Sequence, residues 1–152
     1  MPSVLIARNL PGSVVAEAKG FFDVTYRDRP DPMSRDEMVA ALKDFDGVLP
    51  TLGDLFTADL FAEAGPGARC KILANFGVGY NHIDVAAAKA AGIAVTNTPG
   101  AVTDATADTA MTLMLMSCRR AAEGERMVRA GAWTGWHPVQ MLGLHMSGKR
   151  LG

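Results

Sequence analysis

A glycine-containing turn between two regular elements is the part of the chain best suited to chemistry. Gly77 and Gly79 lie in the segment 76–84, which follows an apolar run and precedes a helical pattern. This spacing begins a dinucleotide-binding fingerprint, but His82 stands where the third glycine is required. The next predicted strand ends in segment 96–98 without the acidic residue that would bind a ribose. The sequence therefore argues against a dinucleotide site at this turn.

Two interpretations of this turn remain. Its backbone N–H groups can point into a crevice and bind a carboxylate, because consecutive free amides form an anion site. Alternatively, the turn only joins a strand to a helix. Under the first interpretation, a side chain at Gly79 would resist a left-handed backbone conformation and would block close approach of the ligand.

The histidines and cysteines do not form a recognisable reactive cluster. His82, His137 and His145 lack the spacing of a metal site and have no evident carboxylate partner, which predicts satisfied or exposed side chains. Cys70 and Cys118 are far apart in apolar surroundings, which predicts two buried, reduced thiols. We therefore expect no metal site and no disulfide.

The elements that would position the turn alternate between short apolar runs and helical patterns. Strands are predicted at residues 4–7, 22–26, 47–50, 70–74 and 93–96. A capping box of Ser34 and Glu37 predicts one helix start, and Thr57 and Asp84 can cap two others. The alternation predicts an α/β fold, a flavodoxin-like doubly wound parallel sheet with helices on both faces, over residues 1–98.

The pattern changes over residues 99–152. One helix is predicted over 103–130, and its middle, 110–116, is apolar nearly all round. Such a helix must be buried on several sides, and a five-stranded lobe cannot do this alone. We therefore expect a further domain, a second copy of the chain, or both to cover it. Residues 132–146 have little regular pattern and are expected to form an arm.

Composition excludes several classes of protein. The net charge is −1 and no basic patch stands out, so nucleic acid is not an expected partner. The longest apolar run, 110–118, is far short of the roughly 20 residues that span a bilayer. The N-terminus carries no recognisable cleavage signal. We expect a soluble, cytoplasmic protein without a membrane partner.

Several motifs, in order, resemble one enzyme family. Residues 75–84 are similar to the substrate-loop motif of the D-isomer-specific 2-hydroxyacid dehydrogenases. Residues 92–100 resemble the strand and hinge that follow, and 103–108 and 118–120 resemble the long interdomain helix. Residues 131–136 resemble the arm of the glyoxylate and hydroxypyruvate reductase branch. The resemblance implies a substrate-binding lobe at 1–98, followed by the entry helix and dimerisation arm of an incomplete Rossmann coenzyme domain.

The resemblance also implies roles for individual residues. The backbone amides of Val78 and Gly79 would hold the substrate carboxylate, and Leu52 would line the same pocket. Thr106 would face the pyrophosphate or nicotinamide end of the coenzyme, although a simple helix-start hydroxyl explains it equally well. Trp136 would reach into the active site of a partner subunit, or it anchors a core or a dimer interface.

The family reduces a small 2-oxo acid, such as glyoxylate or hydroxypyruvate, with NADH or NADPH. By the resemblance, the coenzyme glycine loop and the catalytic arginine, glutamate and histidine are expected beyond Gly152, so no catalytic residue is assigned here. The chain alone is expected to be inactive and to form a homodimer through residues 103–130 and the arm that carries Trp133 and Trp136. The alternative is a non-catalytic dimerisation or interaction module from a shortened gene.

A receiver-type signalling domain shares the strand and helix alternation but does not fit this sequence. Its first strand would have to end in paired acidic residues that bind a metal ion. Here the first strand ends in Ala7, Arg8 and Asn9.

Overall fold

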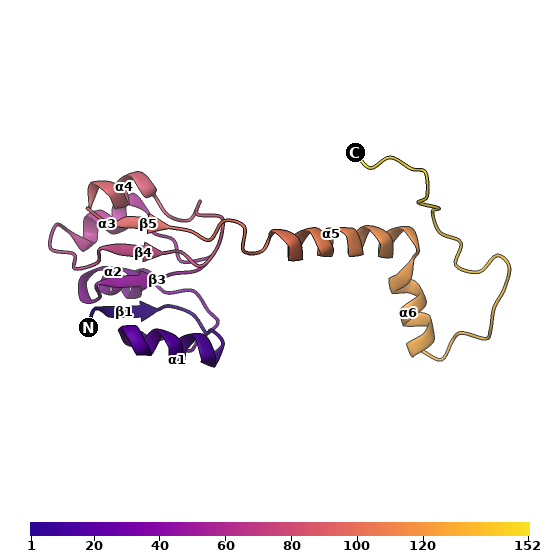
Figure 1. Cartoon of the computed structure of the whole chain (residues 1–152), viewed down its shortest axis with the longest axis horizontal. Helices are drawn as coiled ribbons and strands as arrows, with labels where there is room; N and C mark the ends of the chain where they lie inside the picture. The colour runs from indigo at the N-terminus through magenta and orange to yellow at the C-terminus, as the bar shows by residue number, and fades with distance from the viewer. The chain divides into compact units, whose positions relative to one another are not determined.

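A computed structural model describes residues 1–152 as two compact units, Met1–Ala101 and Val102–Gly152, which are treated separately below. Figure 1 labels their helices and strands along the chain. The elements of the first unit are β1 (Ser3–Ile6), α1 (Gly12–Phe21), β2 (Asp23–Tyr26), α2 (Arg35–Asp44), β3 (Gly47–Leu49), α3 (Ala58–Ala64), β4 (Ile72–Ala74), α4 (Val85–Ala90) and β5 (Ala94–Thr96).

The five strands form one sheet in the order β2-β1-β3-β4-β5, and every neighbouring pair is parallel. This is the strand order of a flavodoxin-like doubly wound sheet, so the predicted fold class is confirmed. All five strands occur where the apolar runs predicted them. The largest shift at a strand start is in β4, which begins at Ile72. Before it, the Cys70 amide donates to the Leu42 carbonyl of α2, and the Lys71 amide donates to the Asp46 carbonyl.

The core lies mainly on one face of the sheet, under α2, α3 and α4. Leu42, Leu60 and Leu73 are fully buried there. Ile6 is also buried but is absent from this cluster, because successive residues of a strand point to opposite faces. Val15 of α1 is buried outside the cluster as well. Helices therefore contribute buried residues to both faces, as predicted.

Local capping explains where two helices begin. At α2, the Glu37 amide donates to Ser34 Oγ at 3.2 Å, and the Ser34 amide donates to Glu37 Oε2 at 2.7 Å. This is the predicted capping box. At α4, Asp84 Oδ1 accepts from the Ala87 amide at 2.9 Å, also as predicted. Thr57 precedes α3, but its side chain makes no capping hydrogen bond.

The second unit contains two helices, so the predicted single helix over 103–130 is wrong. Helix α5 (Thr103–Cys118) ends, and α6 (Ala121–Arg129) begins after Arg120, whose φ of 54° is left-handed. Figure 1 shows the bend between them. At this break the Leu144 amide of the arm donates to the Cys118 carbonyl oxygen at 2.8 Å, which satisfies a carbonyl left without a helical donor. Gly143 permits the approach, since a Cβ there would lie 2.3 Å from that oxygen.

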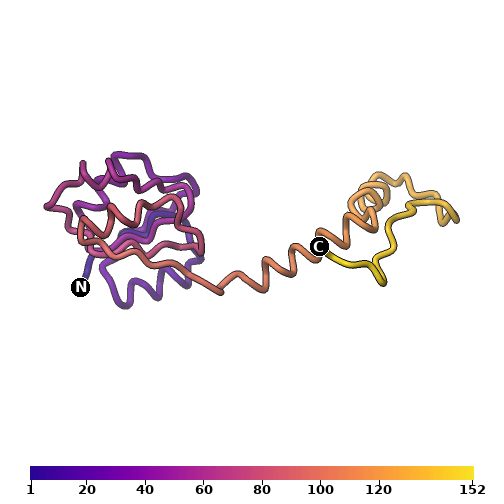
Figure 2. Tube along the Cα trace, turned by 90° about the horizontal axis from the view of Figure 1, so that it is seen from above, coloured from indigo at the N-terminus to yellow at the C-terminus, as the bar shows by residue number.

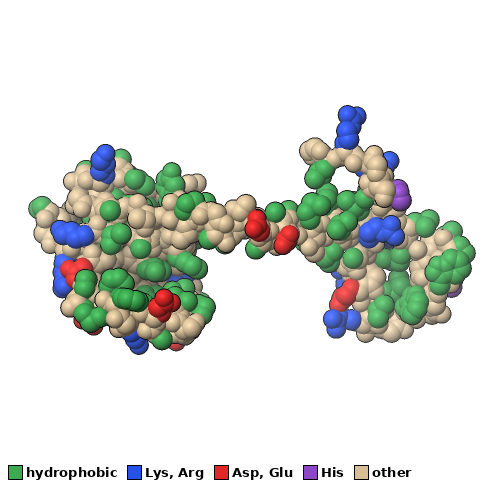
Figure 3. Space-filling view, in the orientation of Figure 1, with side chains coloured by type: hydrophobic (Ala, Val, Ile, Leu, Met, Phe, Trp, Pro, Cys, Tyr) green, Lys and Arg blue, Asp and Glu red, His purple; other side chains and the backbone are tan.

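No residue of the second unit is buried within its own chain. Cys118 is half-buried, which corrects the prediction of a buried thiol, whereas Cys70 is buried as predicted. Figure 2 shows the arm, 132–146, as an irregular trace. Hydrophobic side chains lie at the surface of this unit in Figure 3, and Leu113 of α5 is 60% exposed. None of the helices has both the length and the apolar character needed to cross a bilayer.

Candidate functional site

Two loops meet where β3 and β4 end. Thr51 and Phe76 form a parallel bridge, and the Phe76 amide donates to the Pro50 carbonyl at 2.9 Å. The loop 51–55 therefore runs beside the loop 75–83. Ligands of open α/β sheets bind at the carboxyl ends of the strands, which makes this edge the candidate site.

A buried carboxylate fixes the first loop. Asp54 is fully buried and accepts hydrogen bonds from the amides of Thr51 at 2.8 Å and Met33 at 2.9 Å. Its third partner is Arg8, whose Nη2 lies 3.1 Å away. Leu52 sits in this fixed loop with 63% of its surface exposed, so its side chain is available to line a pocket. Sequence reasoning missed the Arg8–Asp54 ion pair. The only local signal for it is an acidic residue shortly after an apolar strand.

A buried amide fixes the second loop. Asn75 is 2% exposed, and its Nδ2 donates to the carbonyl oxygens of Gly77 at 3.1 Å and Gly79 at 2.9 Å. Its Oδ1 lies 3.0 Å from His82 Nε2, and because Oδ1 can only accept, that nitrogen carries the proton. The histidine is thus satisfied, as predicted. Sequence reasoning did not identify Asn75.

The electrostatic setting of His82 favours a neutral ring. Burial lowers the pKa of this imidazole, and the negative charge of Asp54 opposes that shift. A neutral ring that donates one hydrogen bond is a structural support for the loop. The carboxylate of Asp54 is already paired with Arg8, so the charges near the site are internally compensated.

The amides predicted to bind a carboxylate are available. Val78 and Gly79 are exposed, and neither backbone N–H donates to an acceptor within the chain. The prediction that Gly79 has a left-handed conformation is wrong, because its φ is not positive. A Cβ at Gly79 would meet nothing within 4 Å, so only an incoming ligand could be blocked by a side chain there.

The other two predicted site residues belong to the second unit. Thr106 is exposed near the start of α5, and its amide donates to the Val102 carbonyl at 2.9 Å. Trp136 lies in the arm and is 79% exposed. Leu52, Val78 and Gly79 are therefore brought to one end of the sheet, whereas Thr106 and Trp136 are presented by a separate unit.

The glycine turn of the first unit does not fit a coenzyme pyrophosphate. Helix α4 has six residues, and the Asp84 carboxylate caps its N-terminus. A negative charge therefore lies where a dinucleotide site would accept phosphate oxygens. No cluster of three or more histidine, cysteine, aspartate or glutamate side chains could hold a metal ion.

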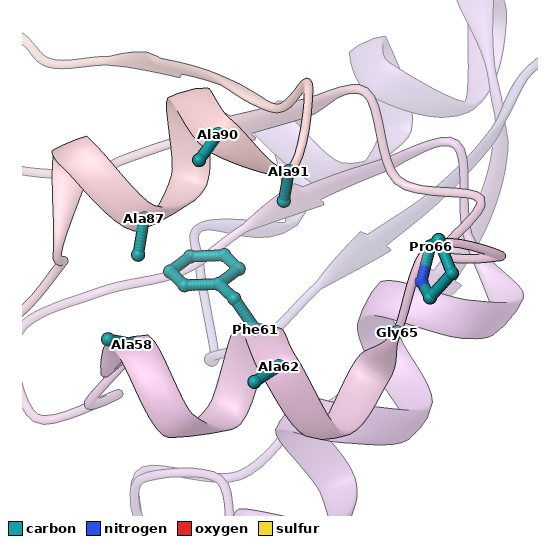
Figure 4. A pocket seen from close by; sticks show the side chains of 8 residues that line it. All are labelled: Ala58, Phe61, Ala62, Gly65, Pro66, Ala87, Ala90 and Ala91. Atoms are coloured by element: carbon teal, nitrogen blue, oxygen red, sulfur yellow. The ribbon is translucent and has the colours of Figure 1, made fainter.

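Elsewhere in the first unit, an apolar pocket of about 360 Å³ lies between α3 and α4. Figure 4 shows the Phe61 ring between the two helices, with alanine side chains around it. The lining side chains carry no charge or hydrogen-bonding group that could orient a ligand. The loops at the carboxyl ends of β3 and β4 are the better candidate for chemistry.

The fold and the two loops define a flavodoxin-like α/β lobe with a turn at its sheet edge whose amides at Val78 and Gly79 are free. Residues 4–137 match the family model of the D-isomer specific 2-hydroxyacid dehydrogenase catalytic domain. The chain belongs to this family. It is 36% identical to a glyoxylate reductase of Thermococcus onnurineus over 99% of its length, and 37% identical to a glycerate dehydrogenase of Hyphomicrobium methylovorum over 98%.

Solved structures give the same result. A D-isomer specific 2-hydroxyacid dehydrogenase from Polaromonas superposes with a TM-score of 0.89 at 34% identity, covering 99% of this chain and 47% of that one. An NADPH-dependent glyoxylate/hydroxypyruvate reductase from Sinorhizobium meliloti, in complex with citrate, gives 0.74 at 31% identity, covering 97% and 45%. The chain spans about half the length of the curated relatives it matches, 46% of each of the two named above.

Proposed function

We propose that this chain is the N-terminal part of an NAD(P)H-dependent reductase of small 2-oxo acids, of the glyoxylate or hydroxypyruvate type. The observation that carries the proposal is the pair of free amides at Val78 and Gly79 beside the fixed loop of Leu52. The names of the similar enzymes, glyoxylate reductase and glycerate dehydrogenase, support this substrate class.

The first unit would bind the substrate. The amides of Val78 and Gly79 donate to the carboxylate, which needs no charged side chain because backbone dipoles favour an anion. Leu52 covers the apolar part of the small substrate. Bound NADH or NADPH supplies the hydride that reduces the substrate carbonyl to a hydroxyl group.

The second unit would contact the coenzyme and a partner subunit. We assign residues 1–98 to the substrate lobe and 99–152 to the entry helix and arm of the coenzyme domain. The hydroxyl of Thr106 would donate a hydrogen bond to the coenzyme. Trp136 would enter the active site of the second copy in a homodimer formed through residues 103–130 and the arm. Its exposed indole is compatible with this role, because tryptophan is enriched at protein interfaces.

The chain alone should not turn over glyoxylate or hydroxypyruvate with either coenzyme. Asp84 at the glycine turn disfavours a pyrophosphate, and His82 already donates its ring proton to Asn75. The test mixes the purified chain, each 2-oxo acid and each coenzyme, and follows the nicotinamide absorbance. A coenzyme-dependent rate above the blank would contradict this expectation.

A chimera tests the function itself. The chain is joined to the C-terminal half of the Thermococcus glyoxylate reductase, and steady-state kinetics are measured. We expect NAD(P)H-dependent reduction of glyoxylate.

In this chimera, Gly79→Val should raise KM for the 2-oxo acid strongly, because the new side chain would block the approach of the substrate, while coenzyme affinity stays nearly unchanged. Tyr80→Phe is the matched control and should have little effect. A chimera that binds coenzyme but reduces no 2-oxo acid would favour the non-catalytic interaction module.

A further inference from the structure

In the glycine turn, the direction of each free backbone N–H depends on which group donates a hydrogen bond to the carbonyl oxygen of the residue before it. A trans peptide is planar, so the C=O of one residue and the N–H of the next point in opposite directions. A donor that draws the Val78 carbonyl towards the protein therefore turns the Gly79 N–H away from it. The same relation links the Gly77 carbonyl to the Val78 N–H.

The carbonyls of residues 77–79 all accept hydrogen bonds from the lobe. The Gly77 oxygen has two donors, the Thr98 amide at 3.1 Å and Asn75 Nδ2 at 3.1 Å. The Gly79 oxygen has Asn75 Nδ2 alone, at 2.9 Å. The carbonyls thus point inward, and the intervening N–H groups are left to face outward.

One side chain alone holds the Val78 carbonyl. Asn97, directly after β5, donates from Nδ2 to the Val78 oxygen at 2.9 Å, and no other donor reaches that oxygen. Asn97 is half-buried, and both of its chain neighbours are hydrogen-bonded to this loop: Thr96 accepts from the Asn75 amide, and the Thr98 amide donates to the Gly77 carbonyl. Asn97 reaches across from β5 to the loop that follows β4.

From this arrangement we infer that Asn97 is a positioning residue that aims the Gly79 N–H at the substrate carboxylate, while Asn75 holds the remainder of the turn. The inference rests on the proposed function, since it names what directs the amides of that site. The two asparagines act on different peptide groups. Loss of Asn97 frees the Val78–Gly79 peptide, whereas loss of Asn75 leaves the Val78 N–H held through Thr98 and frees the Gly79–Tyr80 peptide.

The orientation can be measured on the whole 152-residue chain by NMR. A neutral paramagnetic cosolute enhances the relaxation of amide protons that face solvent. In the wild type we expect strong enhancement at both Val78 and Gly79. In Asn97→Ala, the freed peptide samples several orientations, so the Gly79 amide should lose part of its enhancement, and Val78 should keep its own. Asn97→Asp has the same shape without the donor and should behave as Asn97→Ala does.

The matched control is Asn81→Ala, which removes an exposed asparagine of the same loop that makes no hydrogen bond through its side chain. It should leave both amides as in the wild type. Asn75→Ala should change the Tyr80 amide more than the Val78 amide. Because Asn75 is buried, this variant can fail to fold, so the two variants Asn97→Ala and Asn97→Asp decide the question. Equal losses at Val78 and Gly79 in both Asn97 variants, or no change in either, would overturn the inference.

Titration with oxalate separates this inference from the proposed function. Oxalate, with sodium chloride at equal ionic strength as the reference, should shift the Val78 and Gly79 amide signals of the wild type. Asn97→Ala should lose the shift at Gly79 first. If the wild type does not respond to oxalate while the cosolute pattern holds, the carboxylate role is refuted and the assignment of Asn97 as the residue that orients the Gly79 amide stands. If oxalate shifts both amides equally in Asn97→Ala, the positioning role is refuted and carboxylate binding stands.

Discussion

The two units of this chain differ in where their apolar side chains go. Every buried residue lies in the first unit, between Leu5 and Ile93, whereas α5 and α6 contribute none. Yet α5 is rich in methionine and leucine, with Met111, Leu113 and Leu115 exposed. The first unit buries its apolar side chains in its own core, whereas the second unit leaves the apolar side chains of α5 and α6 unburied within this chain. Our prediction is still that a further domain or a second copy covers them.

The largest expected effect separates the units by stability. Leu73 of β4 is fully buried, and Leu73→Ala should lower the free energy of unfolding by about 3 kcal/mol through lost burial and a residual cavity. Leu113→Ala in α5 removes the same atoms from an exposed site and should cost less than about 0.5 kcal/mol. Urea unfolding at low protein concentration, followed by far-UV circular dichroism, measures both. Equal losses would show that α5 is buried in solution even in a single copy.

A second prediction concerns the polar centre of the first unit. Asp54→Ala should cost about 3 kcal/mol, because it leaves the partly buried Arg8 without its counter-charge and unpairs the amides of Thr51 and Met33. The control is Asp59→Ala, which breaks an ion pair with Arg35 on the surface and should change stability little. Thermal unfolding of the two variants gives the comparison. A similar effect at both sites would mean that the buried pair does not stabilise the loop.

The parts of the fold that sequence reasoning predicted depend on local signals. Apolar runs bounded by breakers predicted the strands, and the side chains of Ser34 and Asp84 predicted helix starts, because each acts within three residues of itself. The candidate turn was found for the same reason, since Gly77 and Gly79 are separated by a single residue. These features need no knowledge of tertiary contacts.

The parts that sequence reasoning missed depend on contacts between distant residues. The end of α5 has no proline or glycine to predict it, and the Cys118 carbonyl at that end accepts from the distant Leu144 amide of the arm. The Arg8–Asp54 pair joins residues 46 apart. Asn75 and Asn97 lie at the ends of two different strands, so their shared role on one loop is visible only in three dimensions.

A third prediction sharpens the comparison through self-association. If a second copy covers α5, Leu113→Glu should convert a dimer to a monomer, because a charge would be placed in an apolar interface. Val14→Glu changes an exposed apolar residue of α1 in the first unit and should leave the dimer intact. Sedimentation velocity of the wild type and both variants measures the oligomeric state. A wild-type monomer at high concentration would refute the dimer.

The smallest expected effect is a pH dependence that arises from His82 of the first unit. Burial lowers the pKa of His82 in the folded chain, so the unfolded chain takes up a proton first, near its ordinary value of about 6.5. The stabilising contribution of the neutral ring is therefore full above about pH 6.5 and is lost as the pH falls below it. Asp31 does not interfere in this range, because hydrogen bonds from Arg29 and Arg27 lower its pKa to about 2.

The measurement is the free energy of unfolding between about pH 7 and pH 5, the range that brackets the ordinary histidine value. His82→Gln keeps a donor for Asn75 Oδ1 but cannot be protonated in this range, so its stability should fall less steeply than that of the wild type. His137→Gln removes an exposed ring of the arm and serves as the matched control, with the wild-type slope expected. If the His137 variant flattened the profile and the His82 variant did not, the pH dependence would belong to the second unit. In that case, the difference in side-chain burial between the two units would not be matched by the expected difference in the pH dependence of their stability.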